Sequence, residues 1–272
     1  MSGLRVWVEG IGLLGPGLGS WSAAREMLRG TQPLATAATV LPAPTRLPPA
    51  ERRRAGAAVK LALAVADEAV AHAQADPAQL ATVFASSSGE GTNCHALCET
   101  LASGTPMLSP TRFTNSVHNA ASGAWHIAVG SRVASTSLCA FDGSFGAGLI
   151  EAATSIALSG ATMLLVASDS PYPEPLNAVR PLPDHFGLAL LLAPAATARS
   201  IASLTITLVG VDHAATRCDD TAFETLRRAI PAAAALPLLI ALAHAAPRRS
   251  VVLDYQAATR LQVDCECTSP AA

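Results

Sequence analysis

The chain has 272 residues, of which 50% are hydrophobic and 14% are charged, and its formal net charge is −2. A chain of this length can bury a substantial core, and the near-neutral charge gives no electrostatic reason to expect nucleic acid or an acidic membrane surface as a partner. Low charge combined with high apolar content favours a protein that covers part of its apolar surface with a partner.

Strands and helices are expected to alternate along the chain. In chain order, we predict a strand at 5–9, a helix from Ser20 to Gly30, a loop at 32–50, one long helix at 51–74, a strand at 81–86, helices at 93–103 and 117–129, a strand at 133–141, a helix at 144–159 and a strand at 161–167. After a proline-rich loop at 171–184, we predict strands at 186–193 and 204–209, a helix near 220–229, an apolar helical run, and strands at 251–255 and 260–267. Unbroken apolar strands separated by helices are typical of a sheet covered on both faces, so we predict an α/β fold with a mostly parallel central sheet.

The N-terminal segment and the longest apolar run exclude two kinds of membrane signal. Residues 1–9 carry an acid inside the apolar run and no cleavage-site pattern, so a signal peptide is not expected. The run Pro231–Ala246 is shorter than the ~20 residues of a membrane span and contains Pro237 and His244. We therefore expect buried helix there, no membrane span, and reduced thiols in a cytoplasm.

Cysteines occur in two close groups. Cys94, His95 and Cys98 form one group, and Cys265 and Cys267 form the other. Neither group has the two-residue gap that paired zinc ligands usually show, and the first spacing also suits one packed face of a helix. No metal and no cofactor are expected.

The glycine pattern Gly10-Ile-Gly12-Leu-Leu-Gly15 follows the first predicted strand and fits the fingerprint of dinucleotide-binding folds. That fingerprint requires a helix to begin at its third glycine, and Pro16 follows directly. Residues 30–33 hold no acid for a ribose. We interpret the stretch as a flexible turn after the strand.

Ser144 is the first of two candidate nucleophiles in the region 137–152. A hydrolase nucleophile elbow needs glycines two residues before and two after the serine. Gly146 is present, but Asp142 takes the other position. We therefore expect Ser144 to be the N-cap of the following helix, and a Ser144 hydrolase stays as an alternative.

Cys139 is the second candidate. A reactive thiol is favoured at the positive end of a helix, but Cys139 precedes Gly143, where the strand is expected to turn into the helix, by four residues. At ~3.3 Å per residue this is ~13 Å along the strand. We expect Cys139 to be a small buried apolar residue, and a Cys139 nucleophile stays as an alternative.

The segment 133–168 resembles the nucleophile region of the β-ketoacyl synthases, the thiolase-like condensing enzymes. In that family a strand ends at a cysteine that heads a buried helix, and counting back from Gly160 places the family's cysteine at Gly143. Four further segments match the family in order, namely 4–12, 83–89, 113–123 and 186–192. The resemblance implies a thiolase-like layered fold equivalent to the N-terminal half of a ketosynthase, with residues 1–200 forming that domain and residues 201–272 a vestigial extension packed on it.

The departures from the family pattern imply a loss of catalysis. Gly143 has no side chain, Asp142 precedes it, and none of the seven histidines is followed by the Gly-Thr of the family's first catalytic histidine. The chain therefore resembles a chain-length factor, the non-catalytic paralogue that pairs with a ketosynthase, in the short form found beside aryl polyene ketosynthases. The resemblance implies a cytoplasmic heterodimer in fatty-acid- or polyketide-type biosynthesis that meets an acyl carrier protein through the complex.

The resemblance also implies a place for the partner. The predicted strand 133–141 would pair with its counterpart across the interface. The candidate tunnel or interface residues are Thr114, His118, Asn119, Ser122, Trp125 and Phe141. His118 and Trp125 equally suit ordinary packing on an apolar helix. Two alternatives remain besides the hydrolase: an active condensing enzyme or acyltransferase that uses Cys139, and a degenerate fold kept as a homodimeric scaffold.

Overall fold

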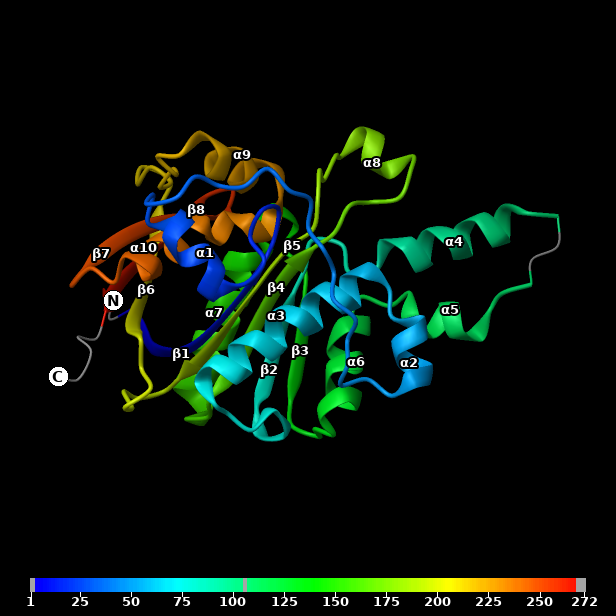
Figure 1. Ribbon diagram of the computed structural model, residues 1–272, viewed down its shortest axis with the longest axis horizontal. Coiled ribbons are helices and arrows are strands. Elements are labelled where there is room, and N and C mark those ends of the chain that lie inside the picture. The colour runs from blue at the N-terminus through cyan, green and yellow to red at the C-terminus, as the bar shows by residue number, and fades with distance from the viewer. Residues whose placement is uncertain (1–2, 105–106, 268–272) are drawn as a thin grey trace.

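An eight-stranded sheet forms the centre of the computed structural model, which describes residues 3–104 and 107–267 (Figure 1). The strands are β1 (Leu4–Leu14), β2 (Ala81–Ala85), β3 (Ser135–Leu138), β4 (Met163–Asp169), β5 (Phe186–Ala193), β6 (Ala202–Gly210), β7 (Arg249–Gln256) and β8 (Thr259–Cys267). Their order across the sheet is β3-β2-β4-β5-β1-β6-β8-β7. β2, β4 and β5 are buried throughout, as their apolar runs predict, and most of β1 is buried as well.

Helices cover both faces of this sheet, as expected (Figure 1). The α-helices are α1 (Trp21–Leu28), α2 (Pro49–Arg54), α3 (Ala57–Ala73), α4 (Gly91–Ala102), α5 (Pro110–Asn115), α6 (Ala120–Val129), α7 (Ser144–Ser159), α8 (Leu176–Val179), α9 (Thr221–Ala229) and α10 (Leu236–His244). The 3-10 helices are η1 (Pro77–Gln79), η2 (Phe141–Gly143) and η3 (Pro231–Ala235). One core lies between the sheet and α3 with α6, and the other lies between the sheet and α1, α7, η3 and α10.

The sheet is mixed, so the prediction of a mostly parallel sheet was wrong. Among the described strands, β2 runs parallel to its neighbours β3 and β4, and the other five pairings are antiparallel. The physical reason is that an unbroken apolar run reports burial on both faces and carries no information on strand direction. Short connections, such as the tight turn between β7 and β8, allow antiparallel pairing without a crossover helix.

Several predicted boundaries also change. The predicted helix 51–74 is broken at 55–56 into α2 and α3, and the predicted helix 117–129 starts three residues later, at α6. The pairing of β3 ends at residue 138 because the chain then turns into η2. The last three strands extend the sheet beyond β1, and the division of the chain near residue 200 stays a prediction.

The first strand runs through the glycine-rich stretch, so the predicted turn there was wrong. A Cβ on Gly10 would lie 2.1 Å from the carbonyl oxygen of Ala69, and a Cβ on Gly12 would lie 2.0 Å from that of Val65. Both carbonyls belong to α3. The two glycines therefore let a helix rest directly on the backbone of a strand.

Side chains of α3 replace a missing strand neighbour along the second half of β1. The carboxylate of Glu68 accepts hydrogen bonds from the backbone amides of Leu13 (2.8 Å) and Trp21 (2.7 Å), and His72 Nδ1 accepts one from Ile11 (3.2 Å). These bonds are needed because β6 pairs only with the first half of β1. Burial raises the pKa of Glu68 above its ordinary value, against the opposing effect of these amides.

The apolar run 231–246 forms η3 and α10, both largely buried, as the sequence predicts. In the part of the chain that the structure describes, there is no helix with the length and apolarity that a bilayer crossing requires.

Candidate functional site

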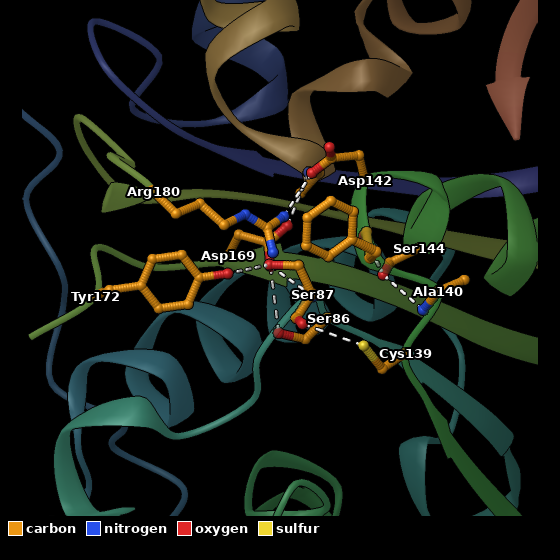
Figure 2. A network of polar contacts seen from close by, with 11 residues as sticks. Ser86, Ser87, Cys139, Ala140, Asp142, Ser144, Asp169, Tyr172 and Arg180 are labelled. Atoms are coloured by element: carbon orange, nitrogen blue, oxygen red, sulfur yellow. Dashed lines mark hydrogen bonds and ion pairs between the residues drawn. The ribbon is translucent and has the colours of Figure 1, made fainter. Parts of the chain in front are cut away.

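Three parallel strands bring polar side chains together at their carboxyl ends (Figure 2). Ser86 and Ser87 follow β2, Cys139 follows β3, and Asp169 is the last residue of β4. The carboxyl ends of parallel strands meet at one edge of a sheet, which is where α/β proteins commonly place their sites.

Asp169 hydrogen-bonds to several of the segments that meet at this edge of the sheet. Its exposed fraction is 2%, and it accepts hydrogen bonds from the backbone amides of Ser87 (2.7 Å) and Ala232 (2.8 Å) and from the hydroxyl of Ser86 (3.3 Å). Burial raises the pKa of the carboxyl, while the hydrogen bonds act in the opposite direction. The hydroxyls of Ser87 and Tyr172 lie 3.0 Å apart beside it. Asp169 is therefore a structural link between β2, β4 and η3.

The corner between β3 and α7 is held by Ser144, in a way that the sequence did not predict. The N-cap of α7 is Gly143. The Ser144 hydroxyl points back into the preceding turn, where it accepts from the amide of Ala140 (3.0 Å) and donates to the carbonyl of Phe141 (2.7 Å). The N-cap prediction for Ser144 was wrong because this side chain bonds the residues before it rather than the free amides of α7. With an exposed fraction of 1% and both bonds made, the hydroxyl is poorly placed to attack a substrate.

The position matched to the family's cysteine has no room for a side chain. A Cβ on Gly143 would lie 2.0 Å from the carbonyl oxygen of Tyr255, at the end of β7. That is far below any van der Waals contact, and the obstructing atom is backbone. The end of β7 thus packs against the start of α7 at the place where a nucleophile would stand.

Phe141 occupies the same corner in a strained conformation. Its φ is 52°, which is unfavourable for a bulky side chain, and 59% of its surface is exposed. The guanidinium carbon of Arg180 lies 3.6 Å from the centre of its ring, and Arg180 also donates to Asp142 (Figure 2). One arginine therefore clamps two consecutive residues of the turn.

Cys139 is exposed, so the prediction of a buried residue was wrong. β3 is an edge strand and stops one residue earlier, which leaves this thiol at the surface. Its Sγ donates to the carbonyl of Ser87 (3.1 Å), away from the helix start at Ser144. The thiol thus lies beside the polar cluster without the helix N-terminus that would activate it.

The predicted tunnel or interface residues separate into two groups. Thr114 and Asn119 line a groove of about 280 Å³ between α2, α3, α5 and α6. The other four lie outside that groove. His118 Nε2 lies 3.2 Å from the carbonyl oxygen of Ser86. Phe141 lies at the corner described above.

The remaining two predicted residues lie on α6. Ser122 Oγ accepts from Ser137 on β3 (3.1 Å). Trp125 is completely buried in the core formed by α3 and α6, which agrees with a packing role.

Glu90 is a functional candidate that sequence reasoning missed. It lies in the loop between β2 and α4, is 4% exposed, and its Oε2 has no hydrogen-bond partner in the described structure. Burial raises the pKa of Glu90, with the amides of Thr92 and Asn93 acting against it. Arg180 and Asp169 were missed as well. The available signal was an acid ending an apolar strand at residue 169, whereas nothing in the proline-rich loop marks residue 180.

No group of three or more metal-ligating side chains lies together within residues 3–104 and 107–267. Large apolar side chains are exposed along α4, α5 and α6. They include Leu101, Phe113, Val117 and Ile127, which are between 43% and 62% exposed. Together with the free edge of β3, this surface has the character of a protein interface.

Comparison with known proteins identifies the family and the fold. Residues 21–244 match the family model described as the N-terminal domain of β-ketoacyl synthase. A chain in the structure of the ketosynthase ApeO in complex with its chain length factor ApeC from Xenorhabdus doucetiae is similar, with a TM-score of 0.71 and 23% identity over 97% of this chain and 99% of that chain. A chain of the ishigamide ketosynthase/chain length factor has a TM-score of 0.74 and 14% identity over 98% of this chain and 100% of that one.

A β-ketoacyl synthase from Burkholderia phymatum STM815 has a TM-score of 0.69 and 12% identity, covering 99% of this chain and 100% of that chain. No protein of the curated set matches in sequence. The expected thiolase-like layered fold is confirmed by these likenesses.

Proposed function

Because the chain belongs to the β-ketoacyl synthase family, we propose that it is a non-catalytic subunit of the chain-length-factor type, which pairs with a ketosynthase and shapes that enzyme's acyl or polyene tunnel. The observation that carries this proposal is the contact between Gly143 and Tyr255. A Claisen condensation needs an acyl-carrying thiolate held beside donors that stabilise an oxyanion. A side chain at residue 143 would collide with the backbone of β7.

The free edge of β3 supports the pairing. β3 ends the sheet and has no partner on its outer side among the described strands. An unpaired edge binds an added strand through main-chain hydrogen bonds. The exposed apolar side chains on α4 to α6 would be covered by the same partner.

The groove beside this surface is the part that would shape the tunnel. It is lined mainly by apolar side chains, with Thr114 and Asn119 among its polar members. His118, Ser122 and Phe141 would belong to the interface, and Trp125 packs beneath α6 in the core. A tunnel wall of this kind sets how much acyl chain the partner can accommodate.

The resemblance to solved ketosynthase and chain length factor complexes supports a role in a complex with a ketosynthase. One of those structures contains an acyl-carrier protein with its ketosynthase. We place this chain in the cytoplasm, in polyketide- or fatty-acid-type biosynthesis of the aryl polyene kind. The substrate would reach it on a carrier protein bound to the complex. Residues 201–272 would be the vestige of a second half, packed on the ketosynthase-like domain 1–200.

Co-expression with the ketosynthase encoded nearest to this gene tests the proposal. We expect a one-to-one complex in size exclusion and malonyl condensation by that complex. Activity should be unchanged when Cys139 and Ser144 of this chain are replaced by alanine. The absence of a complex, or activity that is lost with Cys139, would refute the proposal.

The exposure of Cys139 favours one second candidate, a condensing enzyme or acyltransferase that uses this thiol. Such an enzyme would be alkylated by iodoacetamide at neutral pH with loss of activity. A stable homodimer that binds no ketosynthase would instead indicate a homodimeric scaffold.

A further inference from the structure

A second cleft lies beside the turn at Phe141 and Asp142, between the loop after α8 and the segment that joins α9 to η3. It has a volume of about 580 Å³. Three arginines, Arg180, Arg227 and Arg228, line it together with the carboxylates of Asp142 and Asp254. Its apolar lining includes Leu182, Ile230, Pro231 and Ala234. The cleft is separate from the groove and from the free edge of β3.

Arg227 is fixed in place and still has donors to spare. Its Nε and Nη2 donate to the two carboxylate oxygens of Glu224 (2.7 and 2.8 Å), and its Nη1 donates to Asp254 (3.2 Å). Its side chain is 12% exposed. A guanidinium has five N–H groups, so two remain for a ligand. A donor that is already held in position loses little freedom when it binds.

Arg180 and Arg228 supply the other two guanidinium groups of the cleft. Arg180 uses one hydrogen bond on Asp142 and stacks against the ring of Phe141, which fixes its plane and leaves other N–H groups open. Within the described residues, the side chain of Arg228 has neither an ion pair nor a hydrogen bond. Arg180 pairs with Asp142, Arg227 with Glu224 and Asp254, and Arg260 also with Asp254. These four arginines, Arg228 included, and three carboxylates leave one surplus positive charge, which favours an anion.

We propose that this cleft binds the phosphate group of a small phosphorylated molecule, whose uncharged remainder lies on the apolar lining. A phosphate has three free oxygens and can accept from more than one guanidinium at a time, whereas a carboxylate would only repeat what Asp142 and Asp254 already do. The volume is that of a site for a small organic ligand. This assignment goes beyond the proposed function and does not depend on it.

Titration of the full chain with phenyl phosphate tests the assignment, with inorganic phosphate and benzoate as comparison ligands. We expect saturable calorimetric binding of phenyl phosphate that weakens as salt is added. Inorganic phosphate should bind more weakly because it makes no use of the apolar lining, and benzoate should bind more weakly still. The substitution Arg228→Ala should lower the affinity about 10-fold or more, since it removes the unpaired guanidinium.

Arg53→Ala is the matched control, because Arg53 is an exposed arginine on α2 and outside the cleft. It should leave phenyl phosphate binding unchanged. Equal loss in both variants, or no saturable binding by the wild type, would overturn the site. Equal affinity for phenyl phosphate and inorganic phosphate would overturn the role given to the apolar lining. Thermal unfolding of each variant shows that a lost affinity is not a lost fold.

Discussion

The backbone carbonyl of Tyr255 lies where a side chain on Gly143 would begin. The first turn of α7 and the end of β7 are thus in contact at a distance that glycine alone permits. On the function that we propose, this contact, rather than the mere absence of a cysteine, would separate the chain from an active ketosynthase. It also makes the separation testable.

Replacing Gly143 with cysteine should therefore not create a nucleophile. We expect Gly143→Cys to lower the free energy of unfolding by about 1–3 kcal/mol or more, because β7 must move away from α7. Thermal unfolding measures this loss, and iodoacetamide labelling should show no reactive thiol at residue 143. Gly123→Ala is the control, since a Cβ there meets nothing within 4 Å. It should be neutral or stabilising. A Gly143→Cys chain as stable as the wild type would show that the contact is not tight.

Ser144→Ala should destabilise the chain without affecting any covalent reaction. The substitution removes the acceptor of the Ala140 amide and the donor to the Phe141 carbonyl, both supplied by the buried hydroxyl of Ser144. We expect a loss of about 1–3 kcal/mol in denaturant unfolding. A fluorophosphonate probe should leave wild-type Ser144 unlabelled, and labelling there would revive the hydrolase interpretation.

Phe141→Gly should have opposite effects on the isolated chain and on the complex. Glycine relieves a left-handed conformation that costs roughly 1–2 kcal/mol, against roughly 0.5–1 kcal/mol lost with the Arg180 stacking. The isolated chain should therefore unfold at the same or a slightly higher temperature. The complex with the ketosynthase should weaken several-fold in a binding titration. Val40→Ala removes a comparably exposed apolar side chain from a loop and should change neither measurement.

Glu90→Gln should stabilise the chain at neutral pH and have no effect in acid. The folded-state pKa of Glu90 is raised, so its neutral form favours the folded chain below the ordinary value of 4.5, and that stability is lost as pH rises through the raised pKa. Glutamine carries no charge and removes this loss. Thermal unfolding between pH 4 and pH 8 measures the difference, with the exposed Glu99→Gln as the control. An equal gain at every pH would show that the charge of Glu90 is not the cause.

Asp169→Asn should loosen the whole edge of the sheet. An amide can accept at one end only, so its NH₂ would face either the Ser87 or the Ala232 amide. We expect a loss of about 2 kcal/mol or more in denaturant unfolding, because at least one buried donor loses its acceptor. Asp212→Asn, on a side chain that is 83% exposed, should be neutral. Similar effects for the two variants would contradict the linking role of Asp169.

The long apolar helices and strands were predictable from the sequence. The directions of the strands and the contacts between the site residues were not. The bounds of α7 and β5 agree with prediction to the residue, because each apolar run ends at a residue that stops the element: Gly160 follows α7 and Pro194 follows β5. Strand direction was missed, since fully buried strands look alike in either orientation. Cys139 was predicted to lie buried in a strand that continues to residue 141, whereas β3 ends at Leu138. Its exposure was missed because it follows from the position of β3 at the edge of the sheet, which is a long-range property. The clamp by Arg180 joins residues almost forty positions apart and leaves no local pattern.

The packing of α3 on β1 has a consequence for hydrogen exchange. The amides of Ile11 and Leu13 donate to side chains of His72 and Glu68 rather than to a neighbouring strand. They should exchange slowly, like amides of a paired strand, and Glu68→Ala should speed the exchange of Leu13 while the rest of the β1–β5 ladder stays protected. Slow exchange of the Leu13 amide would thus report on the Glu68 carboxylate, and that of the Ile11 amide on His72, rather than on pairing between strands.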